Sequence, residues 1–87
     1  MAVSTPSTID DRDWYTAAVG AAETLLTSNG NGFYYLIAES KPSDALRIGH
    51  VVDGFTNEPV VTLAGETLYV RSRSGAITLV ATIDTGD

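Results

Sequence analysis

The sequence predicts an all-β fold, a small antiparallel β-sandwich or jelly roll with an extended amino-terminal arm. Short apolar segments with two-residue alternation recur about every 8–12 residues, as they do in sandwiches. Gly, Asn, Asp and Pro residues separate these segments where tight turns are needed. With 87 residues, the chain has room for one domain. We therefore expect residues 1–13 to be an arm and residues 14–87 to form a single sandwich of about six or seven strands.

The arm is predicted from its composition, MAVSTPSTIDDRD. Val3 and Ile9 are its only sizeable apolar side chains after the initiator Met1. A segment with so little to bury cannot offset the entropy that it loses on ordering unless another surface receives it. We expect the arm to be mobile or to lie against a neighbouring subunit.

Residues 14–27, WYTAAVGAAETLLT, fit two interpretations. As a helix they place Trp14, Leu25 and several alanines on one stripe. As strands they divide near Gly20, with one strand over residues 14–19 and another over residues 23–27. Gly in a helix interior costs about 1 kcal/mol relative to Ala, and Thr and Val are also poor helix formers. We prefer the two strands, and the helix stays open as an alternative.

A tight turn at Asn29-Gly30 is predicted next, because Asn and Gly accept the positive φ of hairpin turns. Such a turn would place Leu26 opposite Phe33 in a hairpin. The strand over residues 33–38 has apolar side chains on both faces. We expect this strand to be central in the sandwich or to be covered on its outer side by another subunit.

Weaker signals mark the middle and the end of the chain. They predict a loop at residues 41–44 and a short edge strand or bulge within residues 46–52. A turn at Asp53-Gly54 follows, and then Phe55 and a strand over residues 60–63 that begins after Pro59. The tail from residue 84 is expected to be frayed.

The clearest strand pair is GETLYVRSRSGAITLVATI, residues 65–83. A two-residue turn at Ser74-Gly75 would set Val70 opposite Leu79, so that one face of the hairpin is almost wholly apolar. The other face would carry charged, aromatic and β-branched side chains, which suit a partly wet surface. We therefore predict that these two strands are neighbours in one sheet.

Charge and composition exclude several kinds of partner. Five Lys and Arg against eleven Asp and Glu give a net charge of -6, which repels a phosphate backbone, so we expect no nucleic acid. The chain has no apolar run long enough for a bilayer and no signal-peptide pattern, so we expect no membrane and synthesis in the cytoplasm. Because it is short and lacks cysteine, we expect self-association to supply further burial.

No group of residues predicts catalysis, a cofactor or a metal. His50 is the only histidine, and none of the serines lies in a nucleophile setting. The densest acidic group is Asp10, Asp11 and Asp13, and it lacks the glycine and the distal Glu of an EF-hand loop. Asp53 and Glu58 are two acids five residues apart, a spacing that many acidic domains contain. We expect a protein that is not an enzyme.

Contacts with other proteins are the remaining prediction. Seven aromatic residues are too many to point inward in so small a sandwich, and outward aromatic side chains commonly anchor interfaces. Arginines at the expected hairpin tip would add charge. The candidate interaction residues are Trp14, Tyr34, Leu36, Tyr69, Arg71 and Arg73.

Three segments carry a resemblance to a known group of proteins: YYLIAESKPSD, RIGHVVDG and GETLYVRSRSGAITLVAT. This pattern resembles small virion proteins of tailed bacteriophages, the accessory β-domains that decorate a capsid or fit at a head or tail joint. The resemblance implies a structural role in the virion, homo-oligomers such as trimers, and a major capsid protein or another virion protein as partner. It offers no catalytic residues.

The first expectation is therefore a phage protein that decorates or stabilises the capsid. Alternatives are a head-tail or tail component, and a carbohydrate-binding sandwich on a tail fibre in which Trp14 or Tyr69 stacks on a sugar. A small hydrolase that uses His50 has the least support in the sequence.

Overall fold

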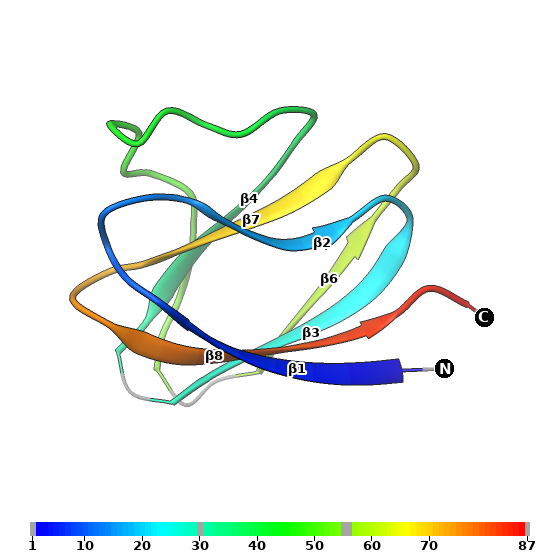
Figure 1. Cartoon of the computed structure of the whole chain (residues 1–87), viewed down its shortest axis with the longest axis horizontal. Coiled ribbons are helices and arrows are strands. Elements are labelled where there is room, and N and C mark those ends of the chain that lie inside the picture. The colour runs from blue at the N-terminus through cyan, green and yellow to red at the C-terminus, as the bar shows by residue number, and fades with distance from the viewer. Residues whose placement is uncertain (1, 30, 55–56, 87) are drawn as a thin grey trace.

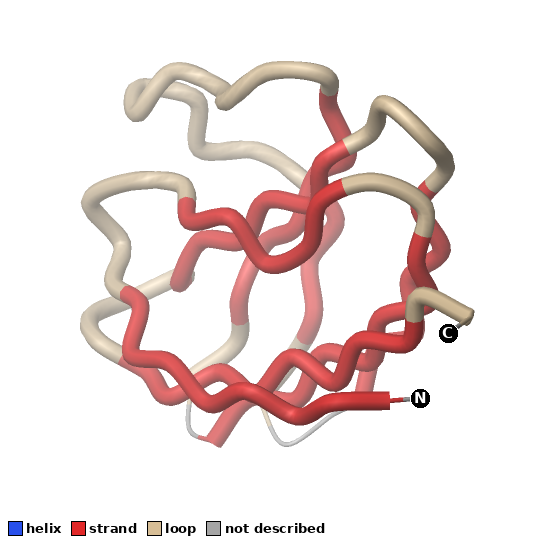
Figure 2. The backbone as a smooth tube through the Cα atoms, turned by 45° about the vertical axis from the view of Figure 1, so that its right-hand side comes forward, coloured by secondary structure: helices blue, strands red, loops and turns tan. Residues whose placement is uncertain are grey.

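The computed structural model describes residues 2–29, 31–54 and 57–86, which form two layers of strands (Figures 1 and 2). The eight strands are β1 (Ala2–Ile9), β2 (Tyr15–Val19), β3 (Ala22–Asn29), β4 (Phe33–Ala38), β5 (His50–Val52), β6 (Asn57–Thr62), β7 (Thr67–Ser72) and β8 (Ile77–Asp84). The described part of the chain contains no helix, and so none that could cross a membrane. The predicted all-β sandwich is confirmed.

The strand order is that of a jelly roll. One four-stranded sheet, sheet A, has the order β1-β8-β3-β6, and the other, sheet B, has the order β2-β7-β4-β5. The pairs are nested, because β1 pairs with β8, β2 with β7, β3 with β6 and β4 with β5, all antiparallel. The chain therefore runs like one long two-stranded ribbon rolled into two layers.

Both predicted hairpins are wrong. β7 lies in sheet B and β8 in sheet A, so the turn near Gly75 carries the chain from one layer to the other. β3 and β4 are likewise in different sheets. Val70 and Leu79 are both buried, as predicted, but each pairs with other strands. Alternation requires only that one face of each strand be buried, and the opposite layer buries it as well as a neighbour in the same sheet would.

The two strands expected in residues 14–27 are confirmed as β2 and β3, and the helix is wrong. They are separated at Gly20, whose φ of 79° lies in the left-handed region that favours glycine. The Gly20 N–H donates to the carbonyl of Glu66 at 2.7 Å. The glycine that weakens a helix is thus the residue at which the chain changes sheets.

The predicted arm is wrong, because residues 2–9 form edge strand β1 of the sandwich. β1 pairs with β8 over its whole length, from Ala2 beside Asp84 to Ile9 beside Ile77 (Figure 1). Its side chains are exposed up to Thr8, as its composition suggested, and only Ile9 is buried. The backbone ladder orders a segment that side-chain burial alone would not order.

The remaining segments differ in their bounds. β5 is the predicted edge strand, reduced to three residues, and β6 begins at Asn57 and includes Pro59. Pro6 and Pro59 both lie in edge strands of sheet A, where a missing N–H need not break the ladder. Gly30 of the predicted turn, and Phe55, lie outside the described residues.

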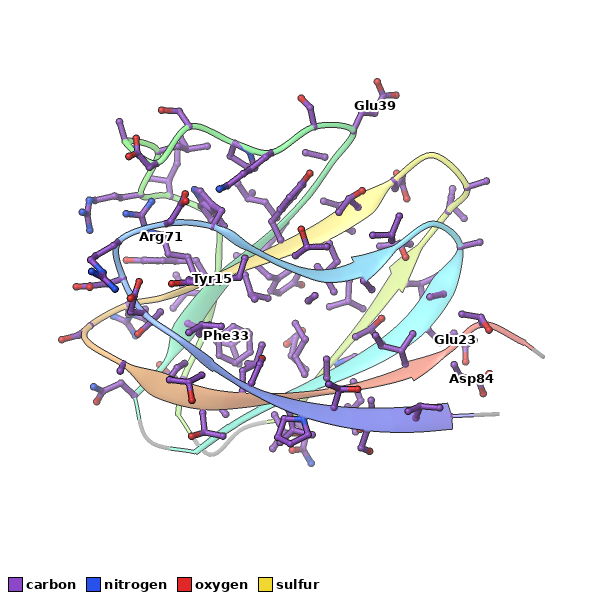
Figure 3. All side chains as sticks on the ribbon, in the orientation of Figure 1. Tyr15, Glu23, Phe33, Glu39, Arg71 and Asp84 are labelled. Carbon is purple, nitrogen blue, oxygen red and sulfur yellow. The ribbon has the colours of Figure 1, made fainter. Side chains whose placement is uncertain are left out.

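The core lies between the two sheets and draws on every strand. Its buried members are Ile9, Ala18, Leu26, Phe33, Val52, Val60, Leu68, Val70, Ile77, Leu79 and Ala81. Phe33 is the largest of them and is fully buried (Figure 3).

Phe33→Ala should therefore destabilise the domain by about 3–5 kcal/mol, the usual cost of removing a buried ring. That is a large share of the roughly 4–13 kcal/mol expected for a domain of this length. Val61→Ala, at an exposed position in β6, should change the free energy of unfolding by less than about 0.5 kcal/mol. Urea denaturation followed by circular dichroism measures both, and a loss below about 1 kcal/mol for Phe33→Ala would contradict this core.

Candidate functional site

Four of the six candidate interaction residues share the outer face of sheet B. Tyr34 of β4 pairs with Arg71 of β7, and Leu36 pairs with Tyr69. These positions alternate with core residues such as Phe33, so the four side chains point away from sheet A. The structure thus brings together residues that the alternation had placed on one face.

That face is covered by the chain itself. The loop of residues 39–49, which joins β4 to β5, lies on the side of sheet B away from sheet A (Figure 1). The loop of residues 10–14 joins it there, because Lys41 Nζ lies 2.7 Å from Asp13 Oδ2. β4 lies between β7 and β5, so it is an inner strand, the first of the two predicted settings. These two loops, rather than another subunit, cover its outer side.

Arg71 holds both loops in place. Its Nε and Nη2 donate to the carbonyl of Asp11 at 3.1 and 2.7 Å, and its Nη1 donates to the carbonyls of Asp44 and Leu46 at 2.6 and 3.2 Å. The residue is only 1% exposed. The prediction that Arg71 presents charge at a hairpin tip is therefore wrong, since it cross-links two loops beneath the surface (Figure 3).

Trp14 is buried against the same group. Its indole N–H donates to the carbonyl of Leu46 at 2.9 Å, and the Arg71 guanidinium lies 5.9 Å from its ring centroid, within range of a cation–π contact. Tyr69 is buried as well. Neither aromatic ring is available to stack on a sugar in this structure, so these two candidates do not form a carbohydrate platform.

Gly49 allows the loop to lie this close to the sheet. A Cβ at this position would stand 2.9 Å from the carbonyl oxygen of Tyr35, a distance that real Cβ atoms essentially never show. It would also stand 3.3 Å from Leu36 and 3.4 Å from Trp14. Gly49 thus marks the point, just before β5, where the loop contacts the covered face.

The remaining candidates are less buried. Tyr34 and Leu36 are half-buried. Arg73 is exposed beyond the end of β7, and its Nη1 lies 3.4 Å from Asp53 Oδ1. Such an ion pair at the surface contributes little to stability.

Two acids of the predicted acidic group, Asp10 and Asp13, make contacts within the chain. Asp10 accepts hydrogen bonds from Arg12 Nη2 at 2.6 Å, Arg12 Nε at 2.9 Å and the Tyr15 hydroxyl at 2.9 Å. The hydrogen bonds from Arg12 lower the pKa of Asp10 from its ordinary 3.8 to about 2. The hydrogen bond from Lys41 similarly lowers the pKa of Asp13. These carboxylates fix the ends of the loops that cover sheet B.

His50 lies at the edge of sheet B. Its ring centroid is 4.8 Å from that of Tyr35, and burial raises the pKa of the Tyr35 hydroxyl. Across residues 2–29, 31–54 and 57–86, no three His, Asp or Glu side chains are grouped so that they could hold a metal ion.

Sequence reasoning missed the outer face of sheet A. Exposed Leu25, Pro59 and Val61 line a shallow hollow of about 430 Å³ there. Glu23 and Asp84, both labelled in Figure 3, border it. The four strands of sheet A contain no Lys or Arg. The signal that could have located this face is the alternation of β3, in which Leu25 lies out of phase with buried Leu26.

Removing the Arg71 side-chain charge should release both loops. Arg71→Met removes the four hydrogen bonds by which the guanidinium links the carbonyls of Asp11, Asp44 and Leu46, so we expect a loss of about 2–4 kcal/mol in the free energy of unfolding and faster amide exchange across residues 39–49. Arg73→Met, the same substitution at an exposed pair, should cost less than about 0.5 kcal/mol. Equal effects of the two variants in denaturant titrations would show that Arg71 does not hold the loops.

Asp10 should make stability depend on pH in acid. Its folded-state pKa lies below its ordinary value, so the ionised carboxylate stabilises the fold above its ordinary pKa of 3.8, and that contribution is lost as the pH falls toward about 2. Asp10→Asn should be less stable than the parent at pH 7 and should lose less stability between these two pH values. Thermal unfolding across the range tests this, and parallel curves for the two proteins would contradict it.

Comparison with known proteins gives no relative from which to take a function. No family model, no curated protein and no solved structure matches the chain.

Proposed function

We propose that this chain is a non-enzymatic structural protein of a tailed-phage virion, which decorates or stabilises the capsid as a homo-oligomer. Its partner in this proposal is the major capsid protein or another virion protein. The segments that resemble phage accessory β-domains include most of β4, all of β5 and β7, and β8 as far as Thr82. The jelly roll agrees with this role, since viral capsid proteins use it, but lectins and cupins do so too.

The observation that carries the proposal is the contrast between the two outer faces. Sheet B is covered by the loops that Arg71 holds. Sheet A presents exposed Leu25 and Val61 on a face without Lys or Arg. An uncovered sheet face with aliphatic side chains suits contact with another protein.

The buried aromatic residues argue against the carbohydrate-binding alternative. Sugar recognition by stacking needs an exposed ring, and Trp14 and Tyr69 are both covered. A head-tail or tail position is tested by the same experiment as the capsid position, because particle images distinguish them.

The chain should be found in phage particles. Tailed-phage particles are purified from cells that make the chain, and mass spectrometry and particle images then search for it. We expect a regular array of small domains on the head. A chain that stays in the supernatant when the particles sediment would contradict the proposal, and density only at the tail would move the site to a joint.

Two matched variants test the contact face. Leu25 on sheet A is 38% exposed and Leu46 in the loop over sheet B is 36% exposed. Leu25→Lys should lower the amount bound to particles about tenfold, as the loss of a central contact residue does. Leu46→Lys, the same substitution on the opposite side, should bind as the parent does. Circular dichroism confirms that both variants are folded.

A further inference from the structure

The edges of the two sheets differ in how well they are protected against pairing with another strand. An unprotected edge presents unpaired N–H and C=O groups to other chains. β6 carries Glu58 and Pro59, β5 has three residues, and the register of β2 shifts between Thr16 and Ala18. β1 has eight residues, no charged side chain and an unbroken register with β8. Among the described residues, β1 pairs with β8 alone.

Pro6 shows which backbone groups of β1 face outward. Proline has no N–H to donate, and Pro6 lies opposite Val80 without a break in register. In a regular ladder its nitrogen therefore points away from β8. Backbone groups alternate in direction along a strand, so Ala2, Ser4 and Thr8 also direct their N–H and C=O groups to the open edge. Pro6 interrupts this row, and the stretch from Ala2 to Ser4 is uninterrupted.

Val3 is the exposed apolar group within that stretch. It lies on the same face of β1 as buried Ile9 and pairs with half-buried Ile83 of β8. It is nevertheless 56% exposed. A core-facing aliphatic side chain is thus left open at the edge of the sheet.

We infer that β1 pairs antiparallel with β1 of a second copy of this chain, about a two-fold axis at Val3. In this register Ala2 of each copy exchanges both hydrogen bonds with Ser4 of the other. Val3 then lies opposite Val3 in a pair without hydrogen bonds, where side chains approach most closely. Pro6 lies beyond the paired stretch, so its missing N–H costs nothing. The two exposed valines continue the apolar row of Ile83 across both copies.

Charge favours this edge for contact between two copies. Each copy carries a net charge of -6, so two copies repel one another wherever their acids meet. β1 brings no charged side chain to the contact. The edge is also self-complementary, which a two-fold contact requires. The inference rests on the proposed function, because it specifies the contact within the proposed homo-oligomer. It makes that oligomer a dimer rather than a trimer.

Mass in solution tests the pairing with two matched variants. Over a roughly hundredfold range of concentration, the parent mass should rise from 9.2 kDa toward twice that value. Val3→Lys places two ammonium groups opposite each other and should raise the dimer dissociation constant about tenfold or more. Val51→Lys makes the same charge change at a side chain in β5 that is 56% exposed, the same fraction as Val3, and should associate as the parent does.

Amide exchange locates the contact. The Ala2 and Ser4 amides should exchange more slowly in concentrated than in dilute solution. A parent that stays monomeric, equal dissociation of both variants, or protection that appears only at β2, β5 or β6 would overturn the inference. Particle binding by a Val3→Lys monomer would overturn the link between this dimer and the virion role, because it would show that binding does not need the dimer. Absence of the chain from particles would count against the virion role and not against the dimer.

Discussion

The burial of one arginine organises the surface of this small domain. Alternation along β7 places Arg71 on the outer face of sheet B, and a buried guanidinium is costly unless its donors are satisfied. The carbonyls of Asp11, Asp44 and Leu46 accept hydrogen bonds from the guanidinium. The loops that contain these carbonyls must therefore lie over the sheet. The same loops then bury Trp14, whose indole N–H shares the Leu46 carbonyl.

This arrangement separates the molecule into a closed side and an open side. The five Lys and Arg residues are Arg12, Lys41, Arg47, Arg71 and Arg73. They lie in β7 or in loops, never in sheet A. Sheet A is left with acids and uncharged side chains, and within the described residues no buried charge holds a loop over its outer face. Surfaces for partners are therefore to be sought on sheet A and at its edge, rather than at the aromatic residues that the sequence singles out.

The strands and the fold class were predictable from the sequence, but the neighbours of each strand were not. Alternation states which face of a strand is buried, and it is equally satisfied by a partner beside the strand or across the core. Val70 and Leu79 illustrate this, since both are buried and yet belong to different sheets. The candidate site failed for a related reason. Alternation placed Tyr69 and Arg71 on an outer face, but both are buried there. The burial of Arg71 depends on backbone carbonyls that no side-chain pattern encodes.

The nested topology explains why the amino-terminal segment belongs to the fold despite its composition. Because β7 and β8 are in different sheets, β8 cannot pair with the strand before it and takes β1 and β3 as neighbours. Without β1, β8 would become an edge strand, and buried Ile77 and Leu79 would lie in an unprotected strand. β1 thus protects one edge of the sheet while presenting another. The uncharged composition of β1, from which an arm was predicted, also leaves its open edge suited to pairing with β1 of a second copy.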